Sequence, residues 1–276
     1  MTPLKHFAQY ISWLSIDVAI GAMAGMLFFE ELLGASLHWP AYVLLGMAVW
    51  SIYTIDHLLD VRNKELPLSP RRAFHQSNWK PLTLVLSMTI LIGMIGAFWW
   101  FGWGKELQLT LVLTGLICGS NLLIRKIGPG WMKELSIAVF YVVGIVWLPL
   151  LRSAGLDLVW QSVIFLPMYM GIAFLNLLML SFLDQDEDRT VGFFSAALTL
   201  SPILLIQLIR RLAFGLIFIS LAGFILLSSF YRPFACIILL MALIHYLTFF
   251  QKGLNTERKR MQMEVSFLLP LLLYFL

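Results

Sequence analysis

Charged residues and cysteine are both scarce in this chain. Asp, Glu, Lys and Arg make up 12% of its 276 residues, against roughly 25% in a soluble domain. The two cysteines, Cys118 and Cys236, lie within apolar runs, where cysteine behaves as a small core residue. We therefore expect neither a disulfide framework nor a cysteine metal site. Long hydrophilic inserts are also missing, so we expect a single domain over residues 1–276.

Hydrophobic residues are abundant instead. They form 60% of the chain, and its mean hydropathy is +0.87. A water-soluble enzyme is excluded, because a soluble protein of this length cannot bury so much apolar surface. At about 20 apolar residues per crossing, this content predicts about eight membrane spans, each an α-helix. The sequence thus predicts an all-α, multi-pass integral membrane protein, and its net charge of +4 gives no indication of a nucleic acid partner.

The apolar runs and the positive charges together predict nine transmembrane helices. The predicted spans are 10–29, 39–59, 81–103, 107–124, 134–151, 158–183, 212–230, 233–250 and 264–276. If the apolar run 193–209 lies at the interface, 16 Lys and Arg residues are on the cytoplasmic side and 3 are on the opposite side. If this run crosses the membrane instead, 11 are on the cytoplasmic side and 8 on the opposite side. The positive-inside rule favours the first arrangement, with the N-terminus inside an inner or plasma membrane and the C-terminus outside.

Two acidic pairs follow the predicted second and sixth spans. Asp56 and Asp60 form one pair, and Asp184 and Asp188 form the other, each with i, i+4 spacing. That spacing places both carboxylates on one helix face, where like charges repel unless a cation compensates them. Mg²⁺ is the natural candidate, because it takes one or two carboxylates together with phosphate oxygens. The same topology brings both pairs to the cytoplasmic side, which predicts a metal site there.

Basic and polar residues accompany the acidic pairs. Arg71, Arg72, Arg125, Lys126 and Lys133 are expected on the same side, and such a mixture fits a metal-bridged diphosphate. Several further residues have two interpretations each. Asn121 and Asn176 fit either a cavity wall or interhelical hydrogen bonds, and Asp17 fits either packing or function. We expect His57 to face away from the site, His245 to be packed in the core, and the positive charges of 252–260 to determine topology.

These residues resemble the UbiA superfamily of intramembrane prenyltransferases. The resemblance lies in the two aspartate pairs, in Asn121-Leu-Leu-Ile-Arg125-Lys126 leading to Lys133-Glu134-Leu135, and in Asp184-x-x-x-Asp188-x-x-x-Gly192. It implies nine helices around a central lipid-accessible cavity, with Mg²⁺ held by Asp56, Asp60, Asp184 and Asp188. It also implies that Lys126, with Arg125, Lys133 and Arg71 or Arg72, contacts the diphosphate. The chain departs from the family at Ile52 and Tyr53, where the first motif usually has Asn and often Asp.

The resemblance implies transfer of a prenyl group from a prenyl diphosphate to a hydrophobic acceptor, with the active site facing the cytoplasm. Tyr53 lies one turn from Asp56 and is expected to reach this site. Membrane lipid is the expected surrounding, and no obligate protein partner is inferred. Two alternatives stay open. One is a secondary transporter whose acid pairs bind coupling cations. The other is a catalytically inactive family member that binds a lipid, and the departures at Ile52 and Tyr53 favour it.

Overall fold

The described part of the protein is built of helices and contains no strands. The computed structural model describes residues 9–61, 69–127, 130–153, 155, 163–191 and 195–275. Its α-helices are α2 (Ile16–Leu33), α3 (Trp39–Val61), α4 (Pro70–Ser77), α5 (Trp79–Phe101), α6 (Lys105–Ile127), α7 (Gly130–Leu151), α9 (Phe165–Leu183), α10 (Gln185–Val191), α11 (Ala196–Thr199), α12 (Pro202–Leu226), α13 (Arg232–Phe250) and α14 (Thr256–Ser266). Two 3₁₀ helices, η1 (Ser229–Tyr231) and η2 (Leu269–Phe275), complete these elements.

Six helical stretches among these residues are long and apolar enough to cross a membrane. They are α3, α5, α7, α9, α12 and the stretch Ser229–Phe250, which joins η1 to α13. Their composition agrees with the predicted multi-pass membrane protein. The long helices α2 and α6 also occupy runs in which a span was expected.

Local sequence signals set many helix ends. α2 stops at Gly34, which adopts a left-handed conformation with φ of 57°, as is common where a helix terminates. α12 begins at Pro202, and the Ser201 hydroxyl accepts a hydrogen bond from the backbone N–H of Leu204 at 3.3 Å. α14 begins after Asn255, whose side chain accepts from the N–H of Arg258 at 3.0 Å. Proline at the first turn and a polar N-cap are the expected start signals of a helix.

The end of the chain differs from the predicted spans. Residues 202–226 form one continuous helix, so Arg210 and Arg211 lie within α12, and the predicted boundary between an interfacial 193–209 and a span at 212–230 is wrong. The expected last span, 264–276, is not one regular α-helix either. It contains the end of the polar helix α14 and the apolar 3₁₀ helix η2.

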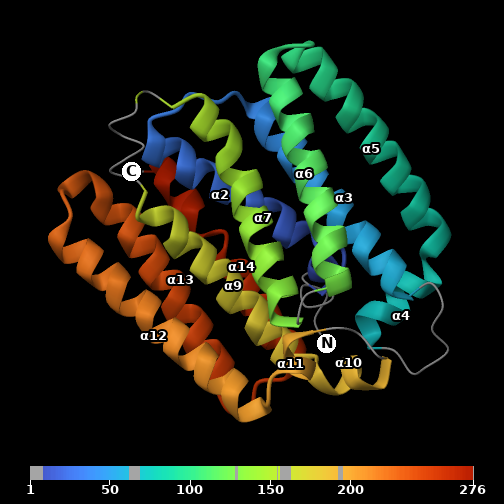
Figure 1. Ribbon diagram of the computed structural model, residues 1–276, viewed down its shortest axis with the longest axis vertical. Coiled ribbons are helices and arrows are strands. Elements are labelled where there is room, and N and C mark those ends of the chain that lie inside the picture. Colours follow the sequence, from blue (N-terminus) through green and yellow to red (C-terminus); the bar gives the residue numbers. More distant parts are fainter. Residues whose placement is uncertain are drawn as a thin grey trace.

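The helices pack around α2, α7 and α9. α2 contacts α3, α7, α14 and η2, while α9 contacts α7, α12 and α13. Figure 1 shows α5 at one side of the molecule and α12 at the other, with the short helices α4, α10 and α11 gathered at one end. The buried core contains large side chains such as Phe28, Phe165 and Tyr169. The polar cavity lies at the ends of α3 and α9 nearest these short helices.

Candidate functional site

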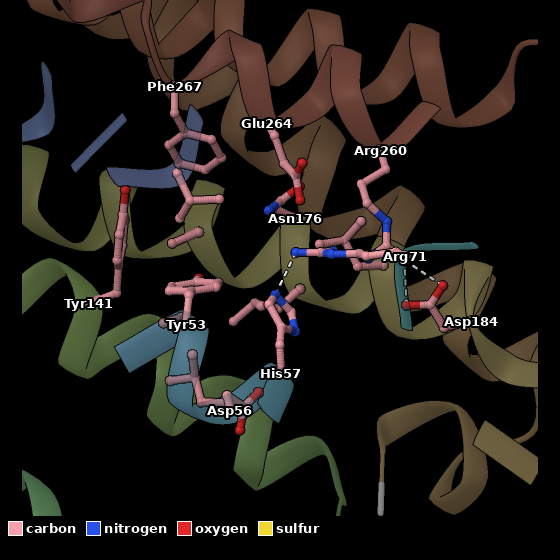
Figure 2. A pocket seen from close by; sticks show the side chains of 16 residues that line it. Tyr53, Asp56, His57, Arg71, Tyr141, Asn176, Asp184, Arg260, Glu264 and Phe267 are labelled. Atoms are coloured by element: carbon pink, nitrogen blue, oxygen red, sulfur yellow. Dashed lines mark hydrogen bonds and ion pairs between the residues drawn. The ribbon is translucent and has the colours of Figure 1, made fainter. Parts of the chain in front are cut away.

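A cavity of about 170 Å³ lies between α3, α4, α7, α9 and α14. Its polar lining residues are Tyr53, Asp56, His57, Arg71, Tyr141, Asn176, Asp184, Arg260 and Glu264, and Figure 2 shows them together with Phe267. Leu177, Leu180 and Ile137 contribute to the apolar part of the wall. The cavity therefore joins a charged region to an aromatic and aliphatic one.

The two predicted aspartate motifs reach this cavity through one member each. Asp56 lies near the end of α3, and Asp184 is the residue at which α9 stops. Asp56 is exposed and lies at the margin of the cavity (Figure 2). Asp60 is not among the residues that line the cavity, and the side chain of Asp188 lies outside the described part. Of the four predicted aspartates, Asp56 and Asp184 therefore line the cavity.

Asp184 is held by an arginine from the end of the chain. The Nη2 atom of Arg260 donates to both carboxylate oxygens of Asp184. Arg260 was expected only to determine topology, so this interpretation was incomplete. The contact joins residues 76 positions apart, and no local pattern connects them. One signal was present in the sequence, because Arg260, Glu264 and Phe267 follow at the i, i+4, i+7 spacing of a single helix face.

Arg71 supplies the second guanidinium of the cavity. Its Nη2 atom lies 2.6 Å from Nε2 of His57 and donates to the Ser15 hydroxyl at 3.0 Å. Burial, followed by the positive charge of Arg260, lowers the pKa of Arg71. His57 was expected to face away from the site, and that prediction is wrong, because its ring lines the cavity and accepts the Arg71 hydrogen bond. Arg71 therefore has a fixed orientation beside a second cation.

Ser15 supports this arrangement from a strained position. It precedes α2 with φ of 54°, a left-handed conformation that is uncommon for residues other than glycine, and it is fully buried. Its hydroxyl lies 3.2 Å from Nε2 of His57 in addition to accepting from Arg71. Backbone strain of this kind persists where surrounding contacts over-determine a conformation. The turn at Ser15 thus positions a hydroxyl against the Arg71–His57 contact.

Other predicted site residues lie elsewhere or are not described. Arg72, the neighbour of Arg71, points to α10 and forms an ion pair of 2.7 Å with Glu187. Lys133 does not line the cavity, and the adjacent Glu134 accepts the backbone N–H of Ala196 at 2.9 Å. This contact fastens α11 to α7. The side chains of Asn121, Arg125 and Lys126 lie outside the described part, so their assignment stays a prediction.

Tyr53 and Asn176 both line the cavity. Asn176 lies two turns before Asp184 on α9, and its buried Oδ1 atom has no hydrogen-bond partner among the described residues. Tyr141 and Phe267 close the apolar side, with ring centroids 6.3 Å apart and nearly perpendicular planes. His245 was expected to be packed in the core, and this is confirmed by its complete burial and its hydrogen bond to the Met241 carbonyl.

The cavity offers carboxylate oxygens, which are the type of ligand that Mg²⁺ prefers. Asp56 and Asp184 line the same cavity, and Mg²⁺ uses few protein carboxylates when phosphate oxygens complete its coordination. The described residues contain no group of three or more His, Cys, Asp or Glu placed to hold a metal on their own.

Comparison of the chain with protein families, curated proteins and solved structures finds no match. The chemistry of this cavity is therefore the basis for any functional assignment.

Proposed function

We propose that this chain is an intramembrane prenyltransferase of the kind found in the UbiA superfamily. The substrate would be a prenyl diphosphate, and the acceptor a hydrophobic molecule reached from the lipid. One observation carries the proposal: a single cavity joins two arginines and two aspartates to an aromatic and aliphatic wall. This polarity matches a molecule with a highly charged head and a hydrocarbon tail.

The arginines would bind and stabilise the leaving diphosphate. Arg71 and Arg260 present planar donor groups that suit phosphate oxygens, and an anion between them would relieve their mutual repulsion. Mg²⁺, when bound by Asp56 and Asp184, would neutralise further charge on the diphosphate. Stabilising charge that develops on a leaving group is a major source of catalysis. The faces of Tyr53, Tyr141 and Phe267 would stabilise the allylic carbocation.

The finer predictions of topology belong to the same proposal. Nine membrane crossings would surround a lipid-accessible cavity that opens to the cytoplasm, with α14 and η2 completing the last crossing. Asp60 and Asp188 would complete the two acidic motifs, and Arg125, Lys126 and Lys133 would contribute further positive charge. The concentration of Lys and Arg in the loops assigned to the cytoplasm supports this orientation.

Two neighbouring arginines give the test. Arg71 lines the cavity, whereas Arg72 pairs with Glu187. A charge-assisted contact contributes about 1.5–3 kcal/mol, so Arg71→Gln should lower kcat/KM for the prenyl diphosphate by roughly ten- to a hundredfold. Arg72→Gln removes the same charge from the same helix and should stay within about threefold of wild type. The measurement is Mg²⁺-dependent incorporation of labelled prenyl diphosphate into membrane extracts. Equal effects of the two substitutions would refute the assignment of Arg71.

A second candidate function is lipid binding without catalysis. The observation that favours it is the Arg260–Asp184 ion pair, which already satisfies both oxygens of a proposed metal ligand. This candidate predicts that purified protein retains labelled prenyl diphosphate but forms no product from it. Turnover in the same assay would decide for the enzyme.

A further inference from the structure

The inner face of α14 changes in chemistry along its length. Arg260 and Glu264 on α14 and Phe267, the residue directly after this helix, all line the cavity and point into it (Figure 2). Seven residues of α-helix rise about 10 Å, so a cation, a carboxyl group and an aromatic ring follow one another over that distance. If the anionic head of a ligand lies at Arg260 and its tail lies at Phe267, the junction between head and tail lies beside Glu264.

Glu264 is one half of a buried carboxyl pair. The other half is Asp17 on α2, against which α14 packs, and Glu264 and Asp17 are 6% and 3% exposed. Asp17 Oδ1 accepts the backbone N–H of Val18 at 2.9 Å, while its Oδ2 meets no N–H or O–H donor among the described residues. Ser12 donates to Glu264 Oε2 at 3.1 Å. Two buried carboxylates that lie close together repel each other, so we expect the pair to hold one proton and one negative charge.

The groups around the pair leave room for a second proton. The charged groups that act on Glu264 are Arg260 on its own helix, Arg71 on α4 and Asp17 on α2. Tyr53 and His57 on α3 and Asp184 on α9 line the same cavity. His57 is the usual type of proton acceptor, but its Nε2 atom already accepts from Arg71. Asp184 is bound by Arg260. Among the described lining residues, Glu264 is the carboxyl group placed at the junction without an arginine hydrogen bond.

We propose that the Asp17–Glu264 pair accepts the proton which the acceptor substrate loses during prenyl transfer. The inference rests on the proposed function and deepens it. The C–O bond of the prenyl diphosphate breaks, and its electron pair leaves with the diphosphate. An oxygen or aromatic carbon of the acceptor forms the new bond to the allylic carbon. The acceptor's bond to hydrogen breaks, its electrons remain with the acceptor, and the proton passes to Glu264. The products are the prenylated acceptor, diphosphate and a fully protonated pair, which returns one proton to water.

This assignment restricts the class of acceptor. The acceptor needs a replaceable hydrogen on a hydroxyl group or on an electron-rich aromatic ring, because the carboxyl pair has no use for a molecule without one. Such an acceptor would place that hydrogen toward α14, on the side of the cavity occupied by Glu264, with its apolar body toward Tyr141 and Phe267.

The test separates proton acceptance from substrate binding. Full-length protein in lipid nanodiscs would be assayed with labelled geranylgeranyl diphosphate and a lipid extract as acceptor, at a series of pH values. Glu264→Gln should lower kcat by about a hundredfold or more, leave KM for the diphosphate within about threefold, and remove the acidic limb of the pH profile. Glu264→Asp should restore part of the rate and the acidic limb. Asp17→Asn, at the other half of the pair, should shift that limb.

The controls decide which proposal fails. Binding of inorganic diphosphate should be unchanged by Glu264→Gln, which shows that the variant is folded and that its arginines are in place. If the wild type is active and the Glu264→Gln variant has a normal kcat and pH profile, the role of the pair as proton acceptor is refuted, and the proposed function stands. A wild type that consumes no prenyl diphosphate would overturn the proposed function and this inference with it. Loss of inorganic diphosphate binding in both Glu264→Gln and Asp17→Asn would show that the pair has a structural role, and would also overturn the inference.

Discussion

Gly25 lies where α2 passes close to α7 and α9. A Cβ atom at this position would lie 2.8 Å from the Tyr169 hydroxyl and 3.1 Å from Ile145 Cγ2. Gly25→Ala should therefore destabilise the protein by about 1–3 kcal/mol through overpacking. Gly144 on α7 is a matched control, because a Cβ there meets nothing within 4 Å; Gly144→Ala should leave stability unchanged or raise it slightly. Thermal unfolding of both variants in one detergent measures the difference, and equal melting temperatures would contradict this packing.

At the same scale, Arg71 and Arg72 show how neighbours in a sequence receive different roles. Both follow the acidic pair of α3, and both fitted a diphosphate contact equally well. The direction of each side chain depends on partners distant in the chain: His57 and Ser15 for Arg71, and Glu187 for Arg72. Residue type and spacing therefore predicted a basic region beside the acids. The choice between its members required the tertiary structure.

Among the elements, α12 and α13 form an antiparallel pair joined by the turn at η1. The Arg210 guanidinium lies over the ring of Phe250, 5.3 Å from its centroid, which places the first third of α12 beside the end of α13. In a background without native cysteines, Gln207→Cys and Lys252→Cys should react with an impermeant thiol reagent from the same side of the membrane. Ser228→Cys, in the connecting turn, should react from the opposite side. Labelling of all three from one side would exclude a membrane-crossing pair.

Hydropathy predicted the central helices well and the last ones poorly. The runs 39–59, 81–103 and 107–124 correspond to α3, α5 and α6 within a few residues, because an unbroken apolar run in lipid has little alternative to helix. Arg210 and Arg211 divide the run in α12, yet the helix continues through them. α14 carries exposed polar residues on its outer face, and its inner face brings Arg260 and Glu264 to the cavity. A hydropathy average cannot distinguish such a helix from a loop, and so Arg260 and Glu264 were not recognised as site residues.

For the molecule as a whole, a ligand that bridges α4 and α14 should stabilise the fold. A ligand at a hundred times its Kd adds about 2.7 kcal/mol to the free energy of unfolding. Inorganic diphosphate with Mg²⁺ should thus raise the melting temperature of the wild type. Arg260→Gln should reduce this shift strongly, because Arg260 lines the cavity. Arg258→Gln should preserve it, because Arg258 is exposed on the same helix. A shift that is the same in all three proteins would place the diphosphate elsewhere.

The ion pair between Arg260 and Asp184 has a consequence for the kinetics of binding. An anion that binds Nη2 of Arg260 must take it from Asp184, so association through this atom includes an exchange of partners after the diffusional encounter. Asp184 would be left without its cation if the anion arrived alone, which is costly in a partly dehydrated cavity. An anion that arrives with its own countercation makes both exchanges together. The Arg260–Asp184 ion pair thus favours binding of an anion together with its cation over binding of either ion alone. This exchange of partners precedes any breaking of covalent bonds.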